Sequence, residues 1–220
     1  MNVMRNMLLG CAMLLSMTVQ AQWRVGATVG TDYNTFSMDK QYLTDWQMQG
    51  RWGFTMGVTG QYDVNDWLGI RADLNWTQKN HRRNRERMPI DYKYLNNYVM
   101  LPVMAVLNVG SEKWRGFVNL GVYGGYWLNS HREGSDLNSF TDKYYEFSEK
   151  VSFDSDRDQR WDCGLVGGIG VEYRFARHWA AQVEARYYHS TTSVQKQYTR
   201  VKDYRYNSTI AIQAGACYIF

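Results

Sequence analysis

Apolar residues alternate with polar or small ones in seven segments of the chain: residues 23–31, 53–63, 67–77, 114–128, 161–174, 179–188 and 204–220. An eighth segment, residues 94–109, is apolar on both faces. Alternation with a period of two is typical of β-strands that bury one face. In the seventh segment, for example, Ala181, Val183 and Ala185 alternate with polar residues. Most segments reach the ~9–11 residues that a tilted strand needs to cross a bilayer. The pattern therefore predicts eight strands.

The connections between these segments alternate in length. The short connections are residues 63–66, 110–113 and 175–178, and the long, charged ones are residues 34–52, 78–92, 129–160 and 189–203. An even number of strands with short turns at one end and long loops at the other is typical of an up-and-down barrel in an outer membrane. The alternation alone fits a second interpretation equally well, a soluble barrel with an apolar cavity.

The polar face of the predicted strands indicates which side of the barrel is the inner one. Glycine crowds this face at Gly26, Gly30, Gly57, Gly69, Gly121, Gly125, Gly164, Gly168, Gly170 and Gly215. The lumen of an eight-stranded barrel is just wide enough for its side chains, so small residues suit it. A water-facing exterior has no need of small residues. The polar face is therefore expected inside and the apolar face outside.

Aromatic residues mark both ends of the predicted strands. At the end with the short turns, the strands begin or finish at Trp23, Trp67, Trp114, Trp179, Tyr62, Tyr173, Tyr218 and Phe220. The opposite end carries Trp76, Tyr126 and Trp161. Two rings of amphipathic aromatic side chains are favoured at the two interfaces of a bilayer. The sequence thus predicts an all-β fold, an eight-stranded antiparallel up-and-down transmembrane β-barrel.

The first 21 residues have the pattern of a secretory signal peptide. Arg5 precedes an almost wholly apolar run at residues 7–19, and cleavage is expected after Ala21. A lipoprotein signal is the alternative, because Cys11 follows Leu-Leu-Gly. Cys11 lies in the middle of the apolar run, however, which favours the cleaved signal peptide. Residues 22–220 would then form the barrel domain.

Composition changes this picture only slightly. The net charge is +4 over 220 residues and becomes +3 when Arg5 is removed, which does not favour nucleic acid as a partner. The mean hydropathy of −0.53 excludes a bundle of transmembrane helices. Cys163 and Cys217 fall on opposite faces of strands that are not neighbours. We therefore expect two free thiols.

Two segments resemble strands of the PorT-like outer-membrane β-barrel family. Residues 98–104 (Tyr-Val-Met-Leu-Pro-Val-Met) are similar to its Tyr-Leu-x-Ile-Pro-Leu-Leu strand, although Met100 stands where the family often has Glu. Residues 161–173 are similar to its Asp-x-Gly…Gly-x-Gly-x-Glu-Tyr strand. The resemblance implies an eight-stranded barrel in a Gram-negative outer membrane. One member of the family acts in type IX secretion, and most have no assigned role.

The predicted inner face carries a set of charged residues: Arg24, Arg71, Asp73, Asp162, Glu172, Arg174, Glu184 and Arg186. Charges confined in this way must pair, so we expect a salt-bridged network that plugs the lumen rather than a path for ions.

Pro102 lies in the fourth strand, where it removes a donor of the β-ladder. We expect either a local bulge or water-filled gap there, or a single tolerated missing hydrogen bond.

A second set of charges lies in the loop of residues 78–92. Its cations Lys79, Arg82, Arg83, Arg85 and Arg87 are candidates to contact an anionic surface partner such as lipopolysaccharide. The alternative is a solvated loop with a positive bias.

Tyr218 and Phe220 resemble the C-terminal signal that is read by the outer-membrane insertion machinery.

Catalysis and metal binding have little support in the sequence. A lipid A-modifying enzyme would need His189 and Ser190 together, but adjacent residues of a strand point to opposite sides. Ser130 and His131 have no orienting acid in view. The residues 154–158 lack the glycine and the distal glutamate of a calcium loop. We therefore expect no enzyme, no cofactor and no metal site.

The predicted function is that of an integral outer-membrane barrel with a plugged lumen and a structural or surface-interaction role. Its partners would be membrane lipid, lipopolysaccharide and the insertion machinery, and it would be a monomer. Its long loops would be extracellular and both termini periplasmic. The leading alternative is an accessory component of a type IX-like secretion apparatus, with proteins of that complex as partners, and a lipid A-modifying enzyme comes third.

Overall fold

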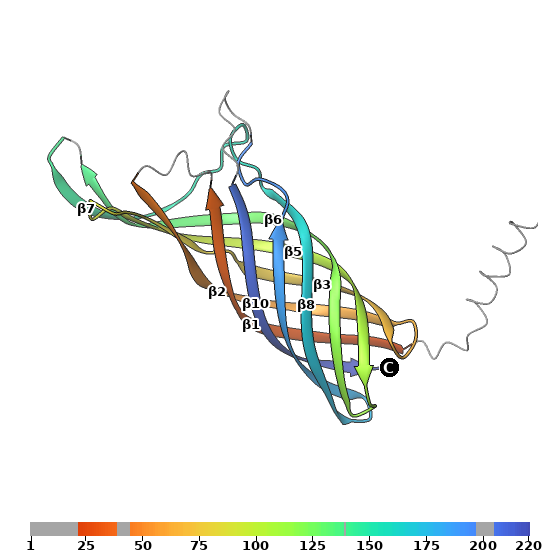
Figure 1. The fold of residues 1–220 in the computed structure, drawn as a ribbon. Helices are drawn as coiled ribbons and strands as arrows, with labels where there is room; N and C mark the ends of the chain where they lie inside the picture. Colours follow the sequence, from red (N-terminus) through yellow and green to blue (C-terminus); the bar gives the residue numbers. More distant parts are fainter. Residues whose placement is uncertain (1–21, 39–44, 139, 197–204) are drawn as a thin grey trace, which may run out of the picture.

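Antiparallel strands close into a barrel in the computed structural model, which describes residues 22–38, 45–138, 140–196 and 205–220 (Figure 1). The predicted signal peptide lies outside these residues. The strands are β1 (Gln22–Met38), β2 (Trp46–Asp63), β3 (Leu68–Gln78), β4 (His81–Arg85), β5 (Asp91–Gly110), β6 (Trp114–Asn138), β7 (Lys143–Lys150), β8 (Trp161–Ala176), β9 (Trp179–Ser190) and β10 (Arg205–Ile219).

Eight of these strands form the ring, in the order β1-β2-β3-β5-β6-β8-β9-β10. Pairing of β10 with β1, for instance Tyr218 with Val25, closes the ring, so no edge is left unpaired around it. Every pair is antiparallel and joins strands that are consecutive in the ring. The predicted eight-stranded up-and-down barrel is confirmed. Among the described residues, no helix is long and apolar enough to cross a membrane.

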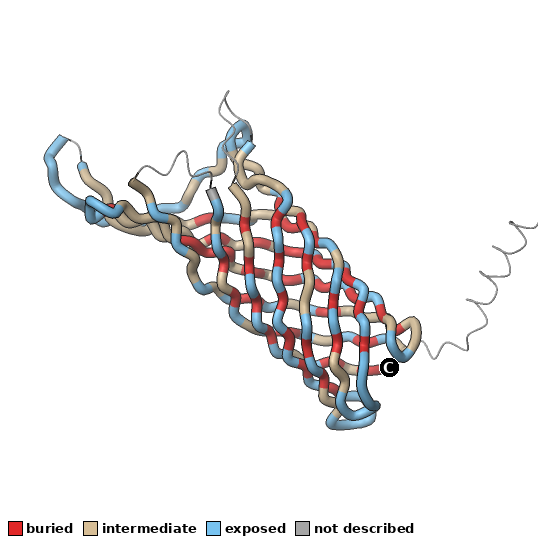
Figure 2. Tube along the Cα trace, in the orientation of Figure 1, coloured by how far each residue is buried: buried red, intermediate tan, exposed pale blue. Residues whose placement is uncertain are grey.

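The two faces of the wall are those that the alternation predicted. Along β9, Gln182, Glu184 and Arg186 are buried, whereas Val183 is 58% and Tyr187 is 47% exposed. Figure 2 shows the same alternation of buried and exposed positions around the barrel. The polar side chains therefore fill the interior and the apolar ones cover the outside. The thiols of Cys163 and Cys217 are free, as expected.

Aromatic side chains form a belt at each end of the exposed apolar surface. At the end with the three short turns, which we call the turn end, Trp23 packs on Tyr62 at 5.0 Å and Trp114 on Tyr173 at 4.5 Å between ring centroids. At the other end, the loop end, Tyr126 and Trp161 are 5.1 Å apart. The chain's C-terminus lies at the turn end (Figure 1).

The long connections are not simple loops, and this corrects the sequence prediction. Beyond the ring, a five-stranded loop-end sheet continues the wall in the order residues 46–50 of β2, β4, residues 91–94 of β5, residues 131–138 of β6, and β7. The β6–β7 hairpin projects furthest from the barrel (Figure 1). These strands lie beyond the belts, where neither face is apolar throughout. No period-two pattern of apolar residues could therefore reveal them.

Pro102 interrupts one ladder without bulging the strand. The β3–β5 ladder pairs Ala72 with Val103 and next Asn75 with Met100, so it skips two positions in an unchanged register. The register shift of the β5–β6 ladder lies between Asn97 and Tyr98 instead. The expected bulge at Pro102 is therefore absent, and the β3–β5 ladder instead lacks two consecutive pairs beside it.

Candidate functional site: the charged lumen and its vestibule

The lumen holds three groups of charged side chains. In the group nearest the turn end, Arg24 contacts Asp63 at 2.8 Å and Glu172 at 2.6 Å between nitrogen and oxygen atoms. Arg115 reaches the same two carboxylates, at 3.3 and 3.8 Å. All four side chains come from different ring strands. Their pairing therefore ties β1, β2, β6 and β8 together across the lumen.

The middle group is the most deeply buried. Arg71 lies 2.9 Å from Asp73 and 3.2 Å from Glu184, and Arg186 lies 2.6 Å from Asp73. Arg186 also donates to Glu184 at 2.9 Å. Each of the four side chains is at most 1% exposed. Two cations and two carboxylates thus neutralise one another where water does not reach them.

The third group centres on Lys79, which the sequence prediction placed in an external loop. Its ammonium is buried in the lumen, 2.7 Å from Asp162 and over the rings of Tyr98 and Tyr123. Ser190 also donates to Asp162, at 2.6 Å. Lys79 is inward because the alternation of Arg71, Asp73, Asn75 and Thr77 continues past the end of β3. It is unavailable to a surface partner.

The alternation also reaches charged residues that the prediction missed or misjudged. Asp63, Arg115 and Asp32 lie in phase with the inner faces of their strands and are inside, although none was predicted there. The carboxylate of Asp32 is fully buried and has no hydrogen-bond partner among the described residues. Arg174, which was predicted in the network, is half-buried at the turn end and has no ion pair there within the described chain.

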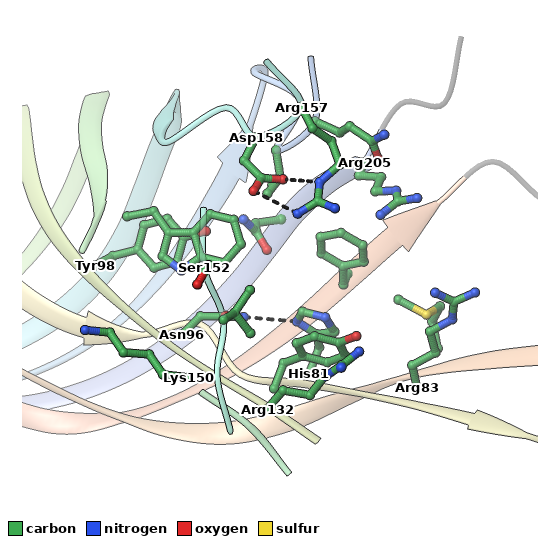
Figure 3. A pocket seen from close by; sticks show the side chains of 18 of the residues that line it. His81, Arg83, Asn96, Tyr98, Arg132, Lys150, Ser152, Arg157, Asp158 and Arg205 are labelled. Atoms are coloured by element: carbon green, nitrogen blue, oxygen red, sulfur yellow. Dashed lines mark hydrogen bonds and ion pairs between the residues drawn. The ribbon is translucent and has the colours of Figure 1, made fainter. Parts of the chain in front are cut away.

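Above the third group, at the loop end, lies a cavity of about 580 Å³ that we call the vestibule. Its aromatic lining consists of Phe36, His81, Tyr94, Tyr98 and Trp127, and its cationic lining of Arg83, Arg132, Lys150, Arg157 and Arg205. Figure 3 shows Arg157 and Arg205 on one side and His81 and Arg132 on the other. The lining residues come from β1, β2, β4, β5, β6, β7 and β10 and from the segments that follow β7 and β9.

The aromatic side chains of the vestibule are stacked in two sets. The ring of His81 lies between those of Phe36 and Tyr94, at 4.6 Å from each between centroids. Tyr98 and Trp127 are parallel and 5.7 Å apart. Stacking on this scale restrains side chains that would otherwise be mobile on a surface. The walls of the vestibule are therefore held in place.

The electrostatics of the vestibule are strongly positive. Burial, together with the charges of Arg205, Arg51 and Arg83, lowers the pKa of His81 to about 3, so its ring is neutral at physiological pH. The carboxylate of Asp158 pairs with Arg157 at 2.9 Å. Burial by itself would raise the pKa of Asp158, but the contact with Arg157 lowers it.

The basic cluster that was predicted in the loop of residues 78–92 is divided by β4. Arg82 points away from the vestibule and pairs with Asp91 at 2.6 Å. Arg83 and Arg85 lie over the ring of Trp46, at 4.0 and 4.9 Å from its centroid. Arg87 is exposed in the turn after β4. The structure thus brings Arg83 and Arg85 together and separates them from Lys79.

The family of the chain follows from its sequence along almost the whole barrel. The outer membrane protein beta-barrel domain family matches residues 7–220. The chain belongs to this family. Membership identifies a bacterial outer-membrane protein, and the outward apolar face between two aromatic belts agrees with it. The narrower assignment to the PorT-like family stays a prediction.

Solved structures of similar outer-membrane barrels cover nearly the whole chain. OprG from Pseudomonas aeruginosa matches 92% of this chain and 97% of its own at 14% identity, with a TM-score of 0.54. Neisserial surface protein A matches 89% of this chain and 96% of its own at 14% identity, with a TM-score of 0.47. At 14% identity the likeness to OprG shows the fold alone. No curated protein sequence matches the chain.

The residues that were weighed for catalysis do not assemble into a catalytic site in the described part of this outer-membrane barrel. Ser190 faces the lumen and donates to Asp162, whereas His189 faces outward. His131 forms a hydrogen bond of 2.8 Å with Ser148, a pairing across β6 and β7 that the sequence did not reveal. No group of three or more metal-ligating side chains occurs among the described residues.

The C-terminal aromatic residues lie where the insertion signal was expected. Phe220 is exposed at the turn end, and its backbone N–H donates to the carbonyl of Trp23 at 3.0 Å. Tyr218 packs on both Trp179 and Phe220, at 5.3 and 5.0 Å between centroids. The last residues of this outer-membrane barrel therefore belong to its turn-end belt.

Proposed function

We propose that this protein is a closed outer-membrane barrel that acts in surface interaction, binding an anionic component such as lipopolysaccharide at its loop end. The observation that carries the proposal is the pair of guanidinium groups of Arg83 and Arg85 over the ring of Trp46. Arg132 also lies over the rings of Tyr92 and Phe147, but its guanidinium group already pairs with Glu149. Stacking orients the planar guanidinium groups of Arg83 and Arg85, and planar guanidinium groups suit bidentate contacts with phosphate or carboxylate.

The proposal places the loop end outside the cell and the turn end, with both termini, in the periplasm. Short periplasmic turns and longer extracellular sections are the usual arrangement in this class of barrel. The rim residues Arg85 and Arg87 would then lie at the level of the anionic head groups of the outer leaflet. Arg82 contributes less to this contact, because Asp91 already neutralises it.

Closure of the lumen is the second part of the proposal. The three groups of paired charges occupy successive levels of the lumen, and Tyr98, Met100, Met104, Tyr123 and Tyr188 pack between the upper two. We expect neither ion conduction nor catalysis. An accessory role in a type IX-like secretion apparatus and modification of lipid A stay as alternatives, and no contact among the described residues favours either.

Replacement of Arg85 and Arg87 by alanine tests the surface contact. Arg85 is half-buried and Arg87 is exposed. At ~0.5 kcal/mol for each rim charge, R85A/R87A should weaken binding of lipopolysaccharide about fivefold. Binding is measured by titration of the protein refolded in detergent free of lipopolysaccharide. The matched control is K113A/R177A, which removes two exposed cations at the turn end and should leave the affinity unchanged. Absence of binding, or an equal loss in the control, would contradict the proposal.

A further inference from the structure

The vestibule is separate from the rim and has the size of a small-molecule site. Its volume of about 580 Å³ lies within the range of ~300–1,000 Å³ that is typical of ligand pockets. Neither Arg85 nor Arg87 is among its lining residues. Below it, the ammonium of Lys79 lies over the ring of Tyr98, 5.3 Å from the centroid. A ligand would therefore enter from the loop end.

The lining of the vestibule carries an excess of positive charge. Five cations and two carboxylates line it, which gives a net charge of +3. Both carboxylates already contact cations, because Glu149 pairs with Arg132 and Asp158 with Arg157. No ion pair involves Arg83 or Lys150 among the described residues. The positive charge of these two groups is left for a ligand.

Three buried donors of the lining have no acceptor among the described residues. They are Nε1 of Trp127, Nε of Arg83 and Nδ2 of Asn207. Buried polar groups are nearly always paired, and a missing partner of an N–H must be an acceptor. The neutral ring of His81 adds a hydrogen-bonding group without adding charge. The positive charge of the lining and its unpaired N–H donors therefore both favour a ligand with anionic oxygen atoms.

The remaining lining indicates that the ligand is more than a bare ion. The rings of Phe36, Tyr94, Tyr98 and Trp127 face the cavity, and aromatic walls pack against flat, partly apolar bodies. A cavity of about 580 Å³ is also far larger than a phosphate or a carboxylate group. Small-molecule sites combine such walls with a few oriented polar groups.

We propose that the vestibule binds a compact organic anion, a ring-shaped molecule that carries a carboxylate or a phosphate group. The anionic oxygens would accept from Arg83 and Lys150, and an oxygen on the ring would accept from Nε1 of Trp127. Carboxylate and phosphate share this chemistry, and separate probes distinguish them. The inference goes beyond the lipopolysaccharide contact. The two sites share Arg83, and variants of Lys150 and of Arg87 distinguish them, because Lys150 lines the vestibule and Arg87 does not.

Calorimetric titration of the protein in detergent free of lipopolysaccharide tests the site with four probes. The ring-shaped anions are digalacturonate and glucose 1-phosphate, and the controls are the neutral sugar maltose and inorganic phosphate. At least one ring-shaped anion should bind, and R83Q and K150Q should each weaken it tenfold or more. R83K keeps the positive charge but loses the planar guanidinium group. Its affinity for the ring-shaped anion should lie between those of the unchanged protein and R83Q. The rim variant R87Q should bind like the unchanged protein.

A pair of tryptophan variants tests the indole donor. W127F removes an N–H that has no hydrogen-bond partner among the described residues, so the fold should survive while the affinity for the ligand falls at least fivefold. W161F changes a tryptophan on the outward face and should have no effect. The proposal is overturned if neither ring-shaped anion binds at millimolar concentration, if R83Q and K150Q bind normally, or if inorganic phosphate binds equally well. Because Arg85 and Arg87 do not line the vestibule, failure of the lipopolysaccharide contact would show as unchanged lipopolysaccharide binding by R85A/R87A. Failure of the vestibule site would show in R83Q, K150Q and W127F.

Discussion

His81 contributes both to the hydrogen bonding of the vestibule and to the stability of the vestibule wall. Its ring fills the space between Phe36 and Tyr94, and Nδ1 lies 3.2 Å from the amide nitrogen of Asn96. Burial and three arginines keep it neutral. A proton on this ring would be both desolvated and repelled, so the folded wall tolerates only the neutral form.

The folded vestibule should therefore weaken as the pH falls. The pKa of His81 is about 3 in the folded protein against 6.5 in an unfolded chain. Below pH 6.5 the unfolded form binds a proton that the folded form does not, which lowers the free energy of local unfolding by about 3 kcal/mol at pH 4. Hydrogen exchange of β4 at pH 7 and pH 4, corrected for intrinsic rates, measures this. H81F keeps a stacked ring and should abolish the pH dependence; an unaltered dependence in H81F would assign it to another group.

At the scale of elements, the loop-end sheet depends on one close approach between β5 and β6. Gly134 has a φ of 157°, and a Cβ atom at this position would lie 1.8 Å from the carbonyl oxygen of Asp91. The same two strands carry Tyr94 and Arg132, which line the vestibule. The geometry of the site is thus set by strand pairing that lies outside the ring.

Gly134→Ala should open the loop-end sheet and leave the ring intact. We expect a local loss of at least about 1 kcal/mol, because the backbone conformation and the contact with Asp91 both oppose a Cβ atom. Faster hydrogen exchange at residues 91–94 of the variant than of the unchanged protein, with equal exchange in β9, would show this local loss of stability. The matched control is Gly124→Ala on the wall, where a Cβ atom meets nothing within 4 Å. Equal exchange in both variants would mean that β5 and β6 adapt without strain.

At the scale of the whole molecule, the ion pairs in the lumen connect strands that are far apart in the sequence. Arg24 and Glu172 are 148 residues apart in sequence and 2.6 Å apart in the lumen. Removal of one partner from a buried pair costs about 3–5 kcal/mol, because the other charge is left buried and unpaired. The closed barrel and its charge network therefore stabilise each other.

The intact protein should conduct no ions. The lumen of an eight-stranded barrel is only just wide enough for its side chains, and we expect three levels of paired charges to leave no continuous column of water through it. Recordings in planar bilayers should show no steady single-channel current, with a wide outer-membrane porin as the positive control. A large and steady conductance of the purified protein would contradict the closure of the lumen.

The strand number, the inner and outer faces and both aromatic belts could be predicted from the sequence. All three follow from a local rule, since a strand between lipid and a narrow lumen must alternate at every second residue. The same rule, applied to the terminal residues of the predicted strands, would also have placed Asp63 and Arg115 inside. Continued two residues past the predicted strand end at residue 77, it would have placed Lys79 inside too. Lys79 was misplaced because a run of charges was interpreted as a loop.

The sequence by itself thus determined a transmembrane barrel and which of its faces is polar. Only the tertiary structure decided which charges pair, because partners such as Lys79 and Asp162 meet through closure and register, over 83 residues of sequence. It alone revealed the loop-end sheet, whose strands have no apolar face to mark them. The vestibule belongs to the same level, since Phe36, Trp127 and Arg205 are brought to one cavity only when β10 pairs with β1.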